Sequence, residues 1–177
     1  MPREQSLHRM LQGGDRRSLG QADEVLRLLR AKPQKIAELV NLLWDTDPVV
    51  RMRAADVTEK LSIDHAEWLQ SYKAELLGMM EESLQQEVRW HLALIVPRLA
   101  LSQTERRKAA VLLERYLEDR SSIVKTFAMQ GLWDLSSGDA AFREAVADRV
   151  LQLTKTGTAA MRARGRKLLN ESGIEKP

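Results

Sequence analysis

The 177-residue chain contains no cysteine, and aromatic residues make up only 5% of it. Without cysteine it can form neither a disulfide nor a thiolate metal site. Its longest uninterrupted apolar run, residues 92–97, has six residues, whereas a membrane-spanning helix needs roughly 18 or more. No basic segment followed by an apolar one opens the chain, so we expect no signal peptide, no membrane partner and a cytoplasmic protein.

The formal net charge of +3 is concentrated at the two ends of the sequence. Residues 1–17 carry a net charge of +2 and residues 157–177 one of +3, while the intervening residues carry −2. A protein that is held to nucleic acid mainly by phosphate contacts normally has a strongly basic surface. The balanced middle therefore disfavours this class, although the basic ends could contact an acidic partner.

Leucine and alanine dominate the composition, with 27 and 19 copies, and this favours helix over sheet. Apolar residues recur at helical spacing in several segments, which are separated by proline, glycine and serine. The sequence predicts about nine helices, arranged as a starter helix followed by four helical hairpins.

A fourfold internal repeat organises the chain. Each copy has an apolar residue followed by a base, and a small or apolar residue comes three positions after the base. Four copies at nearly constant spacing are hard to obtain by chance. The bases, which are 38, 36 and 37 residues apart, are Arg51, Arg89, Lys125 and Arg162.

A single helical hairpin cannot bury its own apolar face, so the copies must stack into a continuous core. On residues 42–55, Leu-Leu-Trp-Asp-Thr-Asp-Pro-Val-Val-Arg-Met-Arg-Ala-Ala, and their later copies, the chain resembles the HEAT-repeat family. It is also similar to a group of bacterial HEAT-repeat proteins over residues 13–17, 87–91 and 121–129. The resemblance covers roughly residues 12–172. It implies an all-α fold, a right-handed α-solenoid (HEAT/armadillo-like superhelix) of four hairpins plus an N-terminal helix.

The predicted domain organisation is a flexible N-terminal arm over residues 1–17 and a single HEAT-repeat domain over residues 18–177. The segment Gly13-Gly-Asp-Arg-Arg-Ser18 has the residue types of an anion-binding loop, but an arm that folds back onto the starter helix is the preferred interpretation. The four copies are expected at approximately residues 33–62, 66–101, 104–137 and 140–172.

The basic column has two interpretations. The bases could contact a ligand, or they could pair with acids in the turns inside the hairpins, as the resemblance to HEAT repeats implies. Asp45 precedes Arg51 by six residues and Asp119 precedes Lys125 by six, while the other two copies have no acid at this place. A turn acid can also accept hydrogen bonds from the start of the next helix. We therefore expect a structural turn ladder made of Asp45, Arg51, Arg89, Asp119, Lys125 and Arg162.

The resemblance also implies a binding surface, because HEAT solenoids usually line their concave face with the second helix of each hairpin. Positions that project from these helices include Leu94, Thr126, Phe127, Gln130, Asp134, Arg164 and Lys167. A face with aromatic, methionine and charged side chains suits docking of a peptide or helix. Packing between adjacent repeats is the alternative role of the two tryptophans. The predicted contacts are Met52, Arg53, Trp90, His91, Arg98, Met129, Trp133 and Arg166.

The sequence lacks the motifs of phosphate-binding loops, dinucleotide-binding folds, zinc proteases and serine hydrolases. Three scattered histidines make a poor metal set. We therefore expect a non-enzymatic adaptor or scaffold that binds a protein or peptide segment, with no catalytic residue, no cofactor and no metal. The rival is a nucleic-acid-binding HEAT-like protein related to DNA base repair, because Trp133-Asp134 and Arg89-Trp90 resemble residue types used by HEAT-like alkylpurine DNA glycosylases; no catalytic motif of theirs aligns.

Overall fold

The computed structural model describes residues 6–15 and 17–171, and most of these residues are helical. No strand occurs among them, which confirms the all-α prediction. Short 3-10 segments, η1 (Pro33–Lys35), η2 (Ala66–Tyr72) and η3 (Val96–Arg98), adjoin the helices. The α-helices are α1 (Leu7–Leu11), α2 (Ala22–Ala31), α3 (Ile36–Leu42), α4 (Pro48–His65), α5 (Lys73–Glu82), α6 (Gln86–Ile95), α7 (Gln103–Leu117), α8 (Ser122–Leu135), α9 (Ala140–Thr156) and α10 (Ala159–Glu171).

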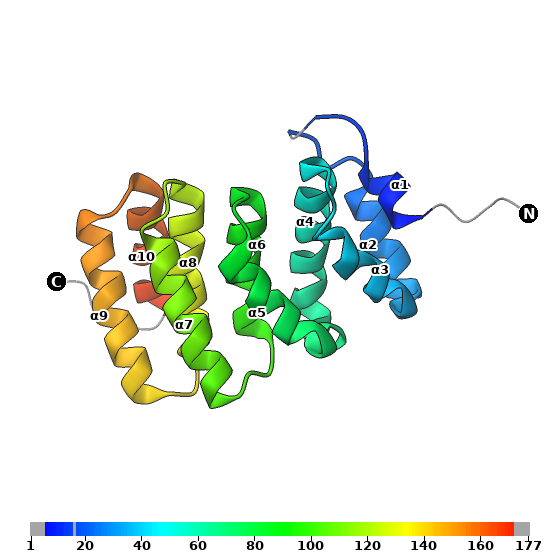
Figure 1. Cartoon of the computed structure of the whole chain (residues 1–177). Coiled ribbons are helices and arrows are strands. Elements are labelled where there is room, and N and C mark those ends of the chain that lie inside the picture. The colour runs from blue at the N-terminus through cyan, green and yellow to red at the C-terminus, as the bar shows by residue number, and fades with distance from the viewer. Residues whose placement is uncertain (1–5, 16, 172–177) are drawn as a thin grey trace, which may run out of the picture.

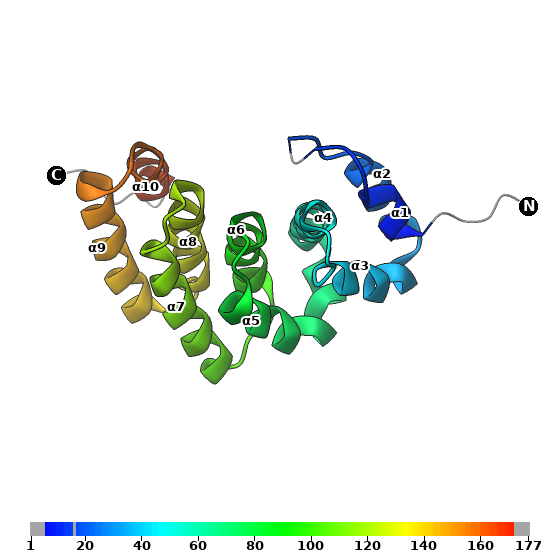
Figure 2. The same cartoon turned by 45° about the horizontal axis from the view of Figure 1, so that its top comes forward.

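The helices lie in two layers, which Figures 1 and 2 show from two directions. Helices α4, α6, α8 and α10 lie side by side, and each contacts its neighbour in this row. Helices α3, α5, α7 and α9 form the second layer. The row is curved, with α4, α6, α8 and α10 on its inner side (Figure 2). We call these four helices the inner layer.

The sequence repeat coincides with the inner layer. Each base of the repeat is the fourth residue of its helix: Arg51 in α4, Arg89 in α6, Lys125 in α8 and Arg162 in α10. The four copied segments therefore lie at the starts of the four inner-layer helices. The residues three positions after each base are all buried, and they are Ala54, Leu92, Ala128 and Gly165.

Helices α6 and α8 pack so closely that there is no room for one additional side-chain carbon between them. A Cβ built on Gly131 in α8 would overlap the carbonyl oxygen of Ala93 in α6 and would lie 3.0 Å from Cδ2 of Leu113 in α7. Because a helix backbone cannot move aside as a side chain can, glycine permits the close approach of α6 and α8.

Tyr116 of α7 contacts both its own layer and the inner layer. It is 1% exposed, and its hydroxyl donates a hydrogen bond of 2.5 Å to the carbonyl oxygen of Met80 in α5. The guanidinium of Arg89 in α6 lies 4.4 Å from the centre of its ring. Burial raises the pKa of Tyr116 to about 12, because an ionised phenol would lose its hydration.

The N-terminal segment belongs to the core. Leu7 and Leu11 of α1 are fully buried, and α1 contacts α2 and α4. The amide of Leu7 also donates to the carboxylate of Glu38 at 2.7 Å. The predicted flexible arm over residues 1–17 is therefore wrong for α1, while residues 1–5 and 16 lie outside the described residues.

Candidate functional site

The basic column makes contacts between hairpins. Nη1 of Arg51 donates to the carbonyl oxygen of Asp45 at 2.5 Å, and its Nε donates to Oε1 of Gln85, at the start of α6, at 2.7 Å. Arg89 forms an ion pair with Asp119, in the turn of the next hairpin. The prediction paired Asp119 with Lys125 inside one hairpin, so the observed pairing differs in its partner. The acids that precede Arg51 and Lys125 by six residues instead accept hydrogen bonds within their own turns.

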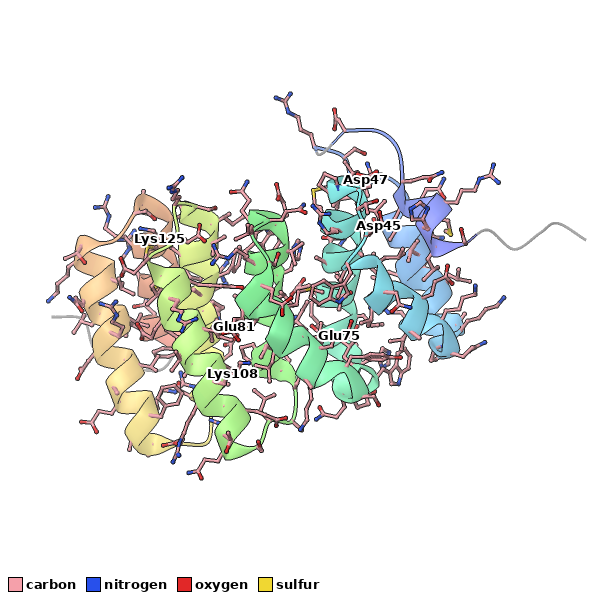
Figure 3. All side chains as sticks on the ribbon, in the orientation of Figure 1. Asp45, Asp47, Glu75, Glu81, Lys108 and Lys125 are labelled. Atoms are coloured by element: carbon pink, nitrogen blue, oxygen red, sulfur yellow. The ribbon has the colours of Figure 1, made fainter. Side chains whose placement is uncertain are left out.

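The two turn acids close the turns before the next helices by accepting hydrogen bonds from the residues at the N-cap positions. The carboxylate of Asp45 accepts a hydrogen bond of 2.8 Å from the amide of Asp47, and that of Asp119 accepts one of 2.7 Å from Ser121. Figure 3 shows Asp45 and Asp47 together at the turn before α4. At the last junction the hydroxyls of Ser122 and Thr158, 2.8 Å apart, connect α8 to α10. At this junction two hydroxyls therefore make the contact between hairpins. Arg162, which was predicted to belong to the ladder, is exposed.

Arg53 lies in the interior, with 1% of its surface exposed. Its guanidinium is enclosed by the described residues between α1 and α2, 12–15 and 17–21, which we call the N-terminal loop. The guanidinium donates to five backbone carbonyl groups, and no carboxylate pairs with it among the contacts of the described residues. The acceptors are Leu11 at 2.8 Å, Gln12 at 3.3 Å, Gly13 at 2.6 Å, Asp15 at 3.2 Å and Ser18 at 3.0 Å.

The N-terminal loop can enclose Arg53 because glycines occupy its tight positions. Gly14 and Gly20 have φ angles of 74° and 54°, in the left-handed region that other residues avoid. A Cβ at Gly20 would lie 2.9 Å from Nη1 of Arg53. Arg53 is therefore a structural residue in this conformation, and its predicted contact with a partner is wrong because the chain itself uses its donors.

His91 belongs to a buried polar cluster between α4 and α6. It is 2% exposed, its Nδ1 lies 2.5 Å from the carbonyl oxygen of Glu87, and its Nε2 lies 3.9 Å from Oδ1 of Asp56. Asp56 is in turn 2.9 Å from Nζ of Lys60. Burial raises the pKa of Asp56, but contact with His91 and Lys60 outweighs this and leaves the pKa below its ordinary value. The prediction that His91 faces a partner is wrong, because the interface of the two helices covers it.

Three more predicted contacts are buried, and two of them, Met129 and Trp133, belong to the apolar core. Met52 and Trp133 are 6% and 9% exposed, and Met129 is fully buried. The guanidinium of Arg143, from α9, lies 4.3 Å from the centre of the Trp133 ring. Trp133 therefore packs in the interior, as the alternative for the tryptophans had it, and the burial of Met52 and Met129 contradicts their predicted contact with a partner.

The remaining predicted contacts are accessible to different degrees. Trp90 is half-buried, and its ring lies 5.1 Å from that of Phe127. Arg98 donates to the carboxylate of Glu59 at 2.7 Å and to Ser62 at 2.8 Å. Arg166 is exposed on α10.

Two adjoining pockets lie along the inner layer at its C-terminal end. One, of about 410 Å³, is mainly apolar, and the other, of about 320 Å³, is polar and extends to α6 and η3. Phe127, Arg164 and Lys167 line both. We call the two pockets together the inner groove. The apolar pocket is completed by Ile123, Thr126, Ala160 and Ala163, and the polar pocket by Leu94, Arg98, Gln130, Asp134, Leu168 and Glu171.

A chain of polar contacts organises the polar pocket. The guanidinium of Arg164 lies 5.3 Å from the centre of the Phe127 ring and donates to Oε1 of Gln130 at 3.2 Å. Nε2 of Gln130 donates to Asp134 at 2.9 Å. Burial raises the pKa of Asp134, against the opposing effects of Gln130 and of nearby arginines including Arg98 and Arg164. The pocket therefore offers oriented hydrogen-bonding groups beside an apolar surface.

Projection of the repeat onto the helices identified much of this groove. Phe127, Gln130, Asp134, Arg164 and Lys167 occupy the positions that were expected to project from the inner layer, although the predicted contacts favoured tryptophan and methionine instead. Sequence reasoning missed the small apolar pocket residues. Each lies four positions before a projecting residue, and this spacing puts both on the same helical face. The spacing could be read from the sequence. The missed residues are Ile123, Ala160 and Ala163.

A larger pocket, of about 630 Å³, lies at the turns between hairpins. Arg89, Arg115 and Arg120 line it together with Glu118 and Asp119. Because the ion pair of Arg89 and Asp119 forms part of its wall, this pocket adjoins the structural ladder.

No protein-family model, curated protein or solved structure matches the chain. In the described ranges, 6–15 and 17–171, no helix has the length and apolar character needed to cross a membrane. Nor do three or more histidine, aspartate or glutamate side chains gather there in a way that could hold a metal ion. The candidate function therefore depends on the chemistry of the inner groove itself.

Proposed function

We propose that the protein is a HEAT-like α-solenoid that acts as a non-enzymatic adaptor and binds a protein or peptide segment in the inner groove. The observation that carries the proposal is the pair of adjoining pockets, one apolar and one polar, along α8 and α10. Binding sites of this kind combine an apolar surface, which supplies affinity, with a few polar groups that fix orientation. The curved row of equivalent helices supports the solenoid assignment, because such rows create extended concave surfaces.

The second candidate, nucleic-acid binding, is favoured by the bases that α10 carries, Arg162, Arg164, Arg166 and Lys167. A phosphate backbone, however, binds best to a continuous track of available cations. Toward the N-terminus the inner-layer cations are engaged within the chain. Lys60 contacts Asp23 and Asp56, and the donors of Arg53 and Arg98 are used in the contacts described above.

A capture experiment with two matched variants tests the proposal. Ala163 is exposed and lines the apolar pocket, so Ala163→Arg should fill the pocket without disturbing the core. Ala145 is an exposed alanine on α9 in the second layer, and Ala145→Arg makes the same chemical change away from the groove. We expect protein partners that bind the parent chain and Ala145→Arg, withstand nuclease treatment, and are lost with Ala163→Arg.

Two results would contradict the adaptor function. Partners that disappear after nuclease treatment would favour nucleic-acid binding. Partners that bind Ala163→Arg as well as the parent would place the binding surface elsewhere on the chain.

A further inference from the structure

Arg164 is held in a position that suits recognition of a carboxylate. Its guanidinium lies over Phe127, and its one hydrogen bond within the described part of the chain goes to Gln130. A guanidinium has five N–H donors in a fixed planar arrangement, so most of its hydrogen-bonding capacity is available. Planar bidentate pairing with a carboxylate is the interaction that this geometry favours.

Lys167 adds a second cation at the same place. It follows Arg164 by three residues on α10, which puts both side chains on one helical face, and both line the two pockets. Its ion pair with Glu171, at 3.8 Å, joins two side chains that are 64% and 60% exposed. Such an exposed pair contributes little, so a bound acid can replace it.

Two acids, Asp134 and Glu171, line the polar pocket, whereas none of the described residues that line the apolar pocket is acidic. Burial raises the pKa of Asp134, and its Oδ1 already accepts a hydrogen bond from Gln130. Arg98 is paired with Glu59 and does not compete for a ligand. Among the described residues that line the apolar pocket, the charged ones are therefore both cations, Arg164 and Lys167.

We propose that the inner groove binds a protein segment that carries an acidic side chain close to an apolar one. Arg164 and Lys167 bind the carboxylate, and the pocket lined by Ile123, Ala160 and Ala163 receives the apolar side chain. This inference rests on the proposed adaptor function and specifies its ligand. Because the pockets share three lining residues, the two ligand side chains are adjacent or one helical turn apart.

The aromatic residues of the groove argue against a nucleic-acid ligand. Base binding without sequence preference depends on open aromatic faces on which successive bases stack. Here the ring of Phe127 already contacts two side chains, since it lies 5.3 Å from the guanidinium of Arg164 and 5.1 Å from the ring of Trp90. Two available cations beside an apolar pocket match a single carboxylate better than a run of phosphates.

The test starts from a phage library that displays random 12-residue peptides, panned against the full chain. Selection against Ala163→Arg in parallel identifies the peptides that depend on the groove. We expect these peptides to share an aspartate or glutamate near a leucine, methionine or phenylalanine. Groove-dependent peptides with no enrichment of acids would overturn the inference and leave the adaptor function intact. Failure to select any groove-dependent peptide would overturn both.

Fluorescence anisotropy with one selected peptide then assigns the carboxylate contact. Arg164→Gln should weaken binding about tenfold, the effect of losing a charge-assisted hydrogen bond. Arg107→Gln makes the same change at an exposed position of α7 outside both pockets and should leave affinity unchanged. Changing the glutamate of the peptide to glutamine should weaken binding to the parent, but hardly to Arg164→Gln. Equal losses with both protein variants, or displacement of the peptide by oligothymidine, would overturn the assignment.

Discussion

Replacement of Arg53 by methionine tests whether this buried cation organises the N-terminal end of the molecule. Methionine keeps an apolar stem in the same space but removes all the donors that reach the N-terminal loop. Of the five carbonyl contacts, the one to Leu11 is buried, and the other four are partly exposed. The substitution therefore separates the contribution of the guanidinium from that of side-chain packing.

The magnitude follows from the exposure of the acceptors. A hydrogen bond from a charged donor contributes about 1.5–3 kcal/mol, and the carbonyl of Leu11 loses its donor without access to water. The partly exposed carbonyl groups can bind water instead, so each adds only a fraction of that amount. Relief from burying a charge offsets part of the loss. We expect Arg53→Met to lower the free energy of unfolding by about 2–4 kcal/mol.

Urea denaturation measures the stability, and limited trypsin digestion at the exposed Arg17 measures opening of the loop. The variant should be cleaved faster while its helical circular dichroism is retained. Arg27→Met is a matched control, because the side chain of Arg27 is 72% exposed. Within the described residues, its ion pair is with Glu24. Unchanged stability together with unchanged cleavage would show that packing of α1 alone holds the loop, and would refute the role given to Arg53.

Three further predictions concern packing, with unfolding in urea as the measurement. Gly131→Ala should lower the free energy of unfolding by about 1–3 kcal/mol through overpacking. Gly78→Ala, where an added Cβ meets nothing within 4 Å, should raise it by about 0.5–1 kcal/mol. Similar effects at both sites would contradict the close approach of α6 and α8. Because burial raises the pKa of Tyr116 to about 12 from 10.0, its contribution to stability should be complete below pH ~10 and decline as the pH rises toward 12. Tyr116→Phe should lack this decline, and an identical alkaline response would refute the assignment. Trp133→Ala should cost about 3–5 kcal/mol, and Trp90→Ala less, since Trp90 is only half-buried; a larger loss at Trp90 would contradict their placement.

The helical architecture could be predicted from the sequence because its signal is local and repeated. Apolar residues at helical spacing identify the helices, and the base at the fourth position of each inner-layer helix recurs at nearly constant intervals. Helix starts were equally readable. Asp47 before Pro48 begins α4, and its carboxylate accepts a hydrogen bond of 2.8 Å from Val49.

The contacts of the predicted site residues depended on partners distant in the chain. The acceptors of Arg53 lie 35 to 42 residues away, in α1 and in a loop that the sequence predicted to fold back without indicating Arg53 as its contact. Arg89 is 30 residues from Asp119, so a search within one hairpin could not find the pair. Periodicity gives the face on which a side chain lies, but not whether another segment covers that face.

The position two residues after each base of the repeat explains where the candidate site lies. It holds Arg53, His91, Phe127 and Arg164 in successive inner-layer helices. The N-terminal loop encloses the first, and the polar cluster with Asp56 encloses the second. Phe127 and Arg164 occupy equivalent positions, but no such segment of the described residues covers them, and they line the groove. Equivalent positions thus stabilise the fold at the N-terminal end and face a pocket at the C-terminal end. A residue's accessibility, more than its type, therefore decides which members of this column can bind a partner.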